Sequence, residues 1–266
     1  MSSRTSFVLV PGAWHRAETW DKITSIFEAK GYTCISVTLP STTGDPTAGL
    51  GNDVSAIQKA IQSQTSQGRD VVLIVHSYGG LVGSSSIRGF ARKHHDNLVS
   101  SSTSSGHVIG MAMMATGFAI TGKSFLATTG GKPPPFWIAD TETGFATLVA
   151  DTRDLFYHDV PEEEGNFWVS KLTKHSLKSL SEGGEHVYSG WKDVPCWYLV
   201  TLEDHALPAD AQKLFVKAAQ EDGGDVTMRQ VAAGHSPMLS KPKEAAAFVL
   251  EAAADFFEKT NMKNVN

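Results

Sequence analysis

The chain has 266 residues, 41% of them hydrophobic and 9% aromatic, which is enough for one large domain or two small ones with a packed core. Its formal net charge of −5 provides no basic surface of the kind that binds nucleic acid or an anionic membrane. No apolar run reaches membrane-spanning length, and the run at residues 7–10 is too short for a secretion signal. We therefore expect a cytoplasmic protein that binds neither nucleic acid nor membranes.

The residues that often bind metals are scattered. Cys34 and Cys196 each lie in an apolar stretch typical of a strand, so we expect two buried thiols rather than a disulfide or a zinc site. The ten histidines form no ligand-like cluster, and no metal is expected. His94 and His95 follow a basic helix end, where solvent or the helix dipole accounts for them better than metal ligation.

Strand-like and helix-like segments alternate along the chain. We expect strands at residues 7–10, 32–37, 71–75, 108–114, 196–200 and 226–231, and helices at 19–30, 53–62, 81–92, 209–220 and 243–258. The strands are apolar without strict alternation, which is typical of a parallel sheet covered on both faces. The prediction is an α/β fold with a mostly parallel sheet of about six strands flanked by helices. The Ser/Thr/Gly-rich stretch at residues 100–106 is expected to be a surface loop or an insertion.

One segment breaks this alternation. About eighty residues separate the strand ending near Thr116 from the strand starting near Pro195, and so long a loop without structure is uncommon in a compact domain. We expect residues 1–117 and 190–266 to form the core and residues 118–189 to form an inserted helical cap. Most large apolar side chains of this segment should form its own small core. A minority are expected to face the cleft and bind the substrate, and the candidates are Phe136, Trp137, Phe156 and Trp168.

Ser77 stands between a buried strand and a pair of glycines. Residues 71–75 are apolar, and Gly79 and Gly80 allow a sharp turn into a helix that packs close to the strand. A strained turn of this kind presents a serine hydroxyl to an open site, which is the geometry of a nucleophile elbow. Val75 departs from the small residue usual at that position, so a strand end followed by a flexible glycine loop is the alternative.

A serine nucleophile requires a base and an acid that orients the base. His235 follows the expected strand at 226–231, at the carboxyl edge of the sheet where open α/β folds bind ligands. Glu203 and Asp204 follow the strand at 196–200 at the same edge, and either could be the acid; Asp204 is preferred for its four-residue step to a proline. His205 is a rival base, but its place next to the acid makes a productive geometry with Ser77 difficult.

The loop after the first strand is the candidate oxyanion hole. Gly12 frees the backbone to turn there, and we assign the two N–H donors to Ala13 and to Tyr78, the residue after the nucleophile. Gly12 and Trp14 of this loop are also expected to contact the substrate.

Four motifs in chain order resemble the plant methylesterase and hydroxynitrile lyase branch of the α/β-hydrolases. They are residues 7–15 (FVLVPGAWH), 76–80 (HSYGG), 202–208 (LEDHALP) and 234–242 (GHSPMLSKP). The resemblance covers nearly the whole chain, including residues 155–157 and 168–172 of the expected cap. It implies the α/β-hydrolase fold, the serine–acid–histidine order of Ser77, Asp204 and His235, a cap before the acid-bearing strand, and no cofactor.

The departures from this family bear on the chemistry. Pro11 stands where the family has a histidine in the oxyanion loop, and Val75 replaces the first glycine of the elbow. Lyases that resemble this chain carry a threonine at the position of Gly12 and a lysine at that of Ser236. Their lysine stabilises the leaving cyanide, so its absence here favours ester chemistry.

The resulting hypothesis is a serine hydrolase acting on a small, fairly apolar carboxylic ester or lactone. Two alternatives stay open: cleavage or formation of a C–C bond, or a cyclisation, by the same triad, and a ligand sensor with little turnover. A nucleotide-binding protein finds no support, because no glycine-rich phosphate loop follows any strand. A homodimer is left open.

Overall fold

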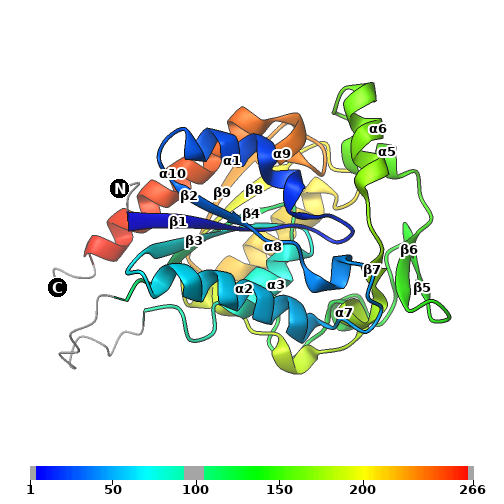
Figure 1. Ribbon diagram of the computed structural model, residues 1–266, viewed down its shortest axis with the longest axis horizontal. Helices are drawn as coiled ribbons and strands as arrows, with labels where there is room; N and C mark the ends of the chain where they lie inside the picture. Colours follow the sequence, from blue (N-terminus) through cyan, green and yellow to red (C-terminus); the bar gives the residue numbers. More distant parts are fainter. Residues whose placement is uncertain (1–3, 93–104, 263–266) are drawn as a thin grey trace.

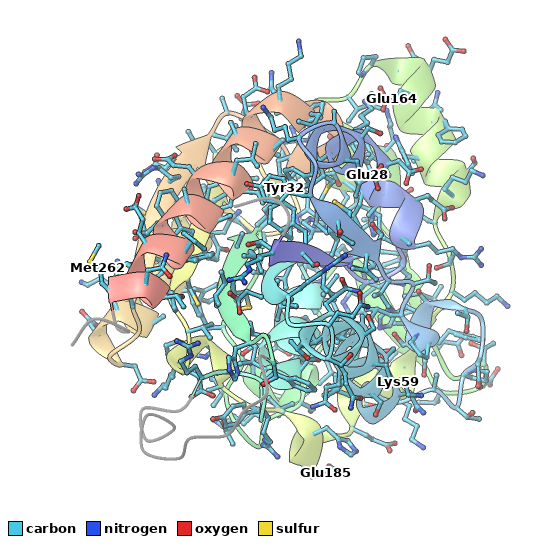
Figure 2. All side chains as sticks on the ribbon, turned by 60° about the vertical axis from the view of Figure 1, so that its left-hand side comes forward. Glu28, Tyr32, Lys59, Glu164, Glu185 and Met262 are labelled. Atoms are coloured by element: carbon cyan, nitrogen blue, oxygen red, sulfur yellow. The ribbon has the colours of Figure 1, made fainter. Side chains whose placement is uncertain are left out.

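The computed structural model describes residues 4–92 and 105–262 (Figure 1). His94, His95 and residues 100–104 of the Ser/Thr/Gly-rich stretch lie outside these ranges. Within them, no helix combines the length and the apolar character needed to cross a membrane. Side chains such as those of Glu164, Glu185 and Met262 project from the periphery (Figure 2).

A six-stranded sheet forms the centre of the molecule. In spatial order its strands are β2 (Thr33–Ser36), β1 (Thr5–Val10), β3 (Asp70–His76), β4 (Val108–Met114), β8 (Cys196–Thr201) and β9 (Val226–Val231). Every neighbouring pair is parallel. Strands β1, β4 and β8 are buried along their whole length, which explains their continuous apolar sequence. The predicted α/β class with a parallel sheet of six strands is confirmed.

Helices cover both faces of this sheet. They are η2 (Ala17–Trp20), α1 (Asp21–Glu28), η3 (Pro40–Thr42), α2 (Leu50–Thr65), α3 (Gly79–Ser86), η6 (Gly190–Lys192), α8 (Ala209–Glu221), α9 (Pro237–Ser240) and α10 (Pro242–Met262). Helices α1 and α10 lie together on one face, and α2 and α3 lie on the other (Figure 1). Helix α2 shows why the sequence folds this way: Val54, Ile57 and Ile61, three or four residues apart, are its buried face.

The expected helix at 81–92 was wrong at both ends. Helix α3 begins at Gly79, directly after the turn at Ser77, and ends at Ser86. Gly89 adopts a left-handed φ of 85°, a conformation that ends helices and that glycine adopts without strain. All eight residues of α3 are buried, so the helix has no amphipathic pattern from which its bounds could be read.

Residues 118–189, here termed the β4–β8 segment, contain both helices and strands. Its elements are α4 (Phe125–Thr128), β5 (Trp137–Asp140), β6 (Phe145–Leu148), α5 (Thr152–Tyr157), α6 (Glu162–Lys171), β7 (His175–Ser176), α7 (Leu177–Ser181) and η5 (Gly184–His186). Strands β5, β6 and β7 form a small antiparallel sheet, so the segment expected to be a helical cap contains strands as well as helices. Helices α5 and α6 and strands β5 and β6 lie beyond the carboxyl end of β1 (Figure 1). The division of the chain into a core and a cap stays a prediction.

Both cysteines are free thiols in strands of the main sheet. Cys196 in β8 is buried, whereas Cys34 in the edge strand β2 is only half-buried. Burial raises the pKa of both thiols, that of Cys34 to about 12, which makes them poor nucleophiles at neutral pH.

The bulk of Val75 is accommodated by a glycine in the helix that packs on it. A Cβ atom added to Gly83 of α3 would lie 2.5 Å from Cγ1 of Val75, whereas the nearest atom of another residue, Cγ2 of Val10, would be 3.8 Å away. The small residue that the elbow usually has on the strand is therefore found on the helix instead. This exchange keeps α3 close to β3 despite the valine.

We predict that Gly83→Ala destabilises the protein and that Val75→Ala relieves the effect. The alanine Cβ overpacks against Val75 by about 1–3 kcal/mol, which outweighs the ~1 kcal/mol that alanine gains over glycine in a helix. In the double variant the clash is absent, so urea unfolding should give a favourable coupling of about 1–2 kcal/mol between the two sites. Simple additivity of the two single changes would contradict this packing argument.

Candidate active site

Ser77 occupies a strained turn between β3 and α3. Its φ of 51° is in the left-handed region, which costs a residue other than glycine roughly 1–2 kcal/mol. Its amide N–H donates to the Met114 carbonyl at 3.2 Å, and its carbonyl accepts from the Gly80 amide at 2.9 Å and the Thr116 hydroxyl at 2.5 Å. A Cβ on Gly79 would collide with the Val10 carbonyl oxygen, so only glycine lets the helix start this close to β1. The backbone around Ser77 is therefore fixed on three sides.

His235 and Asp204 lie together at the carboxyl ends of β9 and β8. Nδ1 of His235 is 2.9 Å from Oδ2 and 3.1 Å from Oδ1 of Asp204, and both side chains are buried. Since an ionised carboxylate only accepts hydrogen bonds, Nδ1 carries the proton and Nε2 keeps its lone pair. A histidine in this state can take a proton from a hydroxyl group.

The Asp204 carboxylate is held from several directions. Oδ1 accepts from the Ala206 and Leu207 amides, each at 2.8 Å, and Oδ2 accepts from the Thr201 hydroxyl at 2.8 Å and the Gln212 amide group at 3.1 Å. Burial alone would raise the pKa of Asp204. The favourable interaction with His235 and these hydrogen bonds outweigh burial and hold the pKa of Asp204 below its usual range, so the carboxylate stays ionised at neutral pH.

His76 connects the serine turn to the loop that carries His235. Its Nε2–H donates to the His235 carbonyl at 2.7 Å, and the two imidazole rings are 4.7 Å apart between centroids. Because His76 directly precedes Ser77, this contact brings His235 to the nucleophile turn. Among the described residues the Ser77 hydroxyl makes no hydrogen bond, and in free enzymes the serine–histidine hydrogen bond often forms only with substrate present.

The two rival residues lie elsewhere. Glu203 is exposed to solvent. His205 stacks on His158 with ring centroids 3.8 Å apart, and its Nδ1 is 3.2 Å from Asp154 of α5. Neither side chain has a contact with Ser77.

The loop after β1 lies directly against the serine. A Cβ on Gly12 would be 3.0 Å from the Ser77 Cβ and 3.1 Å from Nδ1 of His76, so only glycine fits here without displacement of these groups. Ala13 and Tyr78 are buried, and in the described part of the chain neither backbone amide donates to a protein acceptor. Trp14 follows with a left-handed φ of 61°.

Trp14 is the centre of an aromatic cluster that contains three further predicted substrate-binding residues. The rings of Phe136, Trp137 and Phe156 lie 6.1–6.5 Å from it. Phe156 also lies 5.5 Å from the His235 ring, which places this cluster beside the candidate base.

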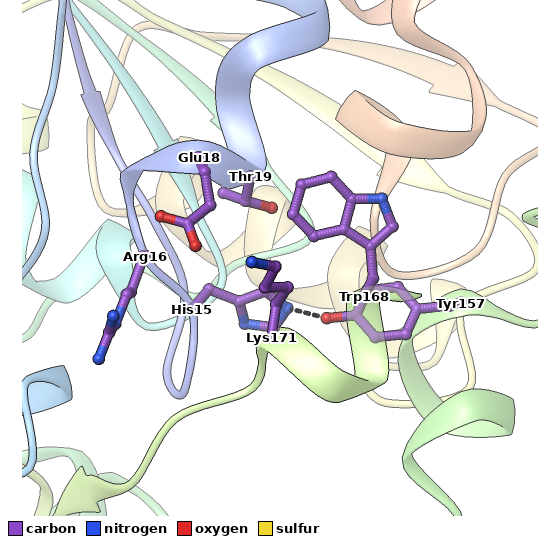
Figure 3. Close-up of a pocket in the computed structure, with 7 residues that line it drawn as sticks. All are labelled: His15, Arg16, Glu18, Thr19, Tyr157, Trp168 and Lys171. Carbon is purple, nitrogen blue, oxygen red and sulfur yellow. Dashed lines mark hydrogen bonds between the residues drawn. The ribbon is translucent and has the colours of Figure 1, made fainter. Parts of the chain in front are cut away.

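The structure places Trp168 apart from this cluster. It lines a surface hollow with His15, Arg16, Glu18, Thr19, Tyr157 and Lys171, shown in Figure 3. The lining includes neither Ser77 nor His235. That Trp168 binds the substrate stays a prediction.

Three further histidines near the site are buried and neutral. Burial lowers the pKa of His15 to about 4, that of His175 to about 3, and that of His76 well below its ordinary value. His15 donates from Nδ1 to the Ala13 carbonyl and accepts from the Tyr157 hydroxyl at Nε2, each at 2.6 Å. In the described ranges no group of three His, Cys, Asp or Glu residues could hold a metal ion.

Sequence reasoning missed several residues that hold the site in place. Gln212 of α8 is fully buried and contacts Asp204, and it shares a helix face with Val216 and Ala219. A polar residue in such an apolar stripe is a signal that could have been noticed. Asp159 accepts from the Gly234 amide at 2.7 Å, next to His235, and nothing in its sequence surroundings indicates this contact.

The parallel sheet, the strained serine turn and the histidine–aspartate pair at its edge define an α/β hydrolase. Residues 7–248 match the model of the alpha/beta hydrolase family, and the chain belongs to this family. It is an enzyme of the hydrolase type, as predicted.

Named relatives cover almost the whole chain. The alpha/beta hydrolase nvfD of Aspergillus novofumigatus is 28% identical over 258 residues, which is 96% of this chain and 99% of that protein. Methylesterase 1 of Arabidopsis thaliana is 24% identical over 283 residues, covering 94% of this chain and 96% of that protein. The crystal structure of polyneuridine aldehyde esterase superimposes with a TM-score of 0.73 at 18% identity, covering 94% of this chain and 99% of that chain. The predicted resemblance to the methylesterase branch is confirmed.

We predict that mild acid destabilises the protein through its buried histidines. Their folded-state pKa values lie below the unfolded value of about 6.5, so the unfolded state binds more protons between about pH 4 and 6.5, and stability falls as pH falls through this window. Each such histidine contributes a slope of up to about 1.4 kcal/mol per pH unit. Urea unfolding at several pH values between 5 and 7 gives the free energy of unfolding as a function of pH. The slope of this free energy against pH should be smaller in His175→Asn than in the wild type, by the equivalent of up to one bound proton. Equal slopes would contradict a neutral, buried His175.

Proposed function

We propose that the protein hydrolyses small, fairly apolar carboxylic esters, lactones included, through a triad of Ser77, His235 and Asp204. The observation that carries the proposal is the His235–Asp204 pair, with its 2.9 Å hydrogen bond, joined by His76 to the left-handed turn at Ser77. A serine on a strained turn and a histidine with a free Nε2 are the two groups that acyl transfer requires.

The reaction follows from these positions. The Ser77 Oγ attacks the carbonyl carbon of the ester while Nε2 of His235 takes its proton. The amides of Ala13 and Tyr78 donate to the oxyanion of the tetrahedral intermediate. His235 then returns the proton to the leaving alkoxide, and an acyl-enzyme remains on Ser77. Water, deprotonated by His235, attacks this ester and regenerates the serine. No cofactor takes part.

The environment of Asp204 supports this role for the pair. Its carboxylate stays ionised because its pKa is held low, so it stabilises the imidazolium that forms at His235 in each proton transfer. The hydrogen bonds from Thr201, Ala206, Leu207 and Gln212 fix both oxygens and thereby the plane of the imidazole. The acid therefore needs no reorganisation as the charge develops.

Two features favour ester hydrolysis over cyanohydrin cleavage. A threonine at Gly12 would press on the Ser77 Cβ and the His76 ring. Ser236 is buried and brings a neutral hydroxyl where a lyase would need an ammonium group. The aromatic cluster around Trp14 provides apolar surface for the substrate, and relatives named as methylesterases act in the same class of reaction.

We predict that a fluorophosphonate probe labels the purified wild-type protein and that labelling is lost in Ser77→Ala and His235→Ala. Hydrolysis of short-chain nitrophenyl esters should fall by roughly 10⁴-fold or more in both variants, because either change removes the activated nucleophile. His205→Ala is the matched control: it removes an exposed histidine from the neighbouring loop and should leave both readouts unchanged.

Two results would overturn the proposal. Undiminished ester hydrolysis in Ser77→Ala would exclude Ser77 as the nucleophile. A folded wild-type protein that is not labelled, yet binds an ester or lactone tightly without turnover, would indicate a ligand sensor instead.

A further inference from the structure

The β4–β8 segment holds the loop that carries the candidate oxyanion donor Ala13. Trp14, the residue after Ala13, makes four hydrogen bonds with this segment. Its carbonyl accepts from the Thr173 amide at 2.9 Å and the Thr173 hydroxyl at 3.0 Å, and its indole N–H donates to the Ala146 carbonyl at 2.9 Å. Its backbone N–H donates to Nδ1 of His175 at 3.3 Å. All of its polar groups are thus bound by residues far away in sequence.

The hydrogen bonds of His175 fix which of its nitrogens carries the proton. Because an amide N–H can only donate, Nδ1 accepts from Trp14 and is unprotonated. The proton is on Nε2, which lies 2.8 Å from the Ser179 hydroxyl oxygen, and that hydroxyl donates to the Ser176 carbonyl at 2.9 Å. The ring is fully buried and its pKa is lowered to about 3, so it remains the neutral acceptor that Trp14 requires.

His175 also contacts the residue on the other side of the candidate oxyanion hole. Its ring lies edge-on to the Tyr78 ring, with centroids 4.8 Å apart. Tyr78 is itself anchored, since its hydroxyl donates to Oδ2 of the buried Asp53 at 2.9 Å. One imidazole therefore packs against Tyr78 and bonds to Trp14, next to both assigned donors.

The hydrogen bond from the Trp14 amide to His175 matters because Trp14 has a strained backbone conformation. A tryptophan at a φ of 61° is strained and persists only where its surroundings hold it. Relaxation of Trp14 would rotate the peptide unit between Ala13 and Trp14. Because this unit is joined at the Ala13 Cα to the Gly12–Ala13 peptide unit, the rotation would also tilt the Ala13 N–H that the preceding unit carries. A small displacement of this N–H group is expected to lower the rate, because loss of one oxyanion donor costs roughly 10²–10³ in kcat.

We propose that His175 is a positioning residue for the oxyanion hole: as acceptor for the Trp14 amide it holds Trp14 left-handed and aims the Ala13 N–H at the developing oxyanion. This proposal rests on the proposed ester hydrolysis. His175 touches neither Ser77 nor His235 in the described chain, so its effect is on the transition state and reaches the substrate only through Trp14.

Three substitutions separate the two hydrogen bonds of His175. His175→Asn places an amide oxygen at the position of Nδ1 and keeps an acceptor for Trp14, but loses the contact with Ser179. His175→Gln places its amide at the position of Nε2, so it keeps a partner for Ser179 and loses the acceptor for Trp14. His175→Leu loses both. The Asn and Gln variants form the matched pair, since each retains one of the two bonds in a side chain of similar polarity.

The test measures kcat and KM on a short-chain nitrophenyl ester, and the inhibition constant of a trifluoromethyl ketone, which forms a tetrahedral oxyanion on the serine. We expect His175→Gln and His175→Leu to lose roughly 10–100-fold in kcat, somewhat less than loss of a donor. KM should stay within about twofold, and the ketone should bind more weakly by the same factor as kcat/KM falls. His175→Asn should retain kcat within a few fold. Circular dichroism and thermal unfolding show which variants are folded.

Several results would overturn the proposal. A folded His175→Gln with wild-type kcat would show that the Trp14 acceptor is dispensable. If Asn lost as much activity as Gln, the effect would come from general packing, and a lowered Tm with unchanged kcat would mean a structural role alone. If the wild type itself hydrolysed no ester and escaped the fluorophosphonate, the proposed function would fail and this inference with it. If the wild type hydrolysed the ester and the His175 variants kept its kcat, only the inference about His175 would be overturned, and the proposed function would stand.

Discussion

The left-handed backbone at Ser77 is the constraint on which the rest of the structure depends. A serine can be held there only if neighbouring groups leave no room for relaxation. The Met114 carbonyl, the Gly80 amide and the Thr116 hydroxyl bind its backbone, and the start of α3 is pressed against β1 at Gly79. The packing of Val75 into the space left by Gly83 also helps to hold Ser77 in this conformation, because it lets α3 begin immediately after the turn.

A second strained residue, Trp14, follows the loop position Gly12 that packs against Ser77, and the two strained residues are held by different parts of the chain. The main sheet and α3 fix Ser77, whereas the β4–β8 segment fixes Trp14 through Ala146, Thr173 and His175. The segment also reaches the base, since Asp159 binds the Gly234 amide beside His235. A change in this segment would therefore alter the alignment of the catalytic groups, in addition to the shape of the substrate site.

Much of the fold and of the candidate triad could be predicted from local sequence. The strand at 108–114 was found with its bounds because it is a buried, continuous apolar run between turn residues. The edge strand at 226–231 also has its predicted bounds, although only Val226 in it is buried. Ser77, Asp204 and His235 stand out because each follows a strand, and parallel strands end at one edge. His175 could not be found in this way: its contact with Trp14 spans 161 residues and depends on how the β4–β8 segment folds. Helix α3 was misjudged for a related reason, since a fully buried helix has no polar face to mark its ends.

The electrostatics of the site follow from the same packing. Four histidines lie close together, yet only His235 has a carboxylate partner. Burial keeps His15, His76 and His175 neutral, and the charge on His235 further lowers the pKa of the first two. In the proposed reaction His235 becomes an imidazolium, and its charge is then balanced by Asp204 and not opposed by a second positive ring nearby. His76 donates its only N–H to the His235 carbonyl, so it stabilises the loop without competing for the proton. The neutral histidines thus hold the geometry of the site, and the proton proposed to be transferred belongs to His235, which is paired with Asp204.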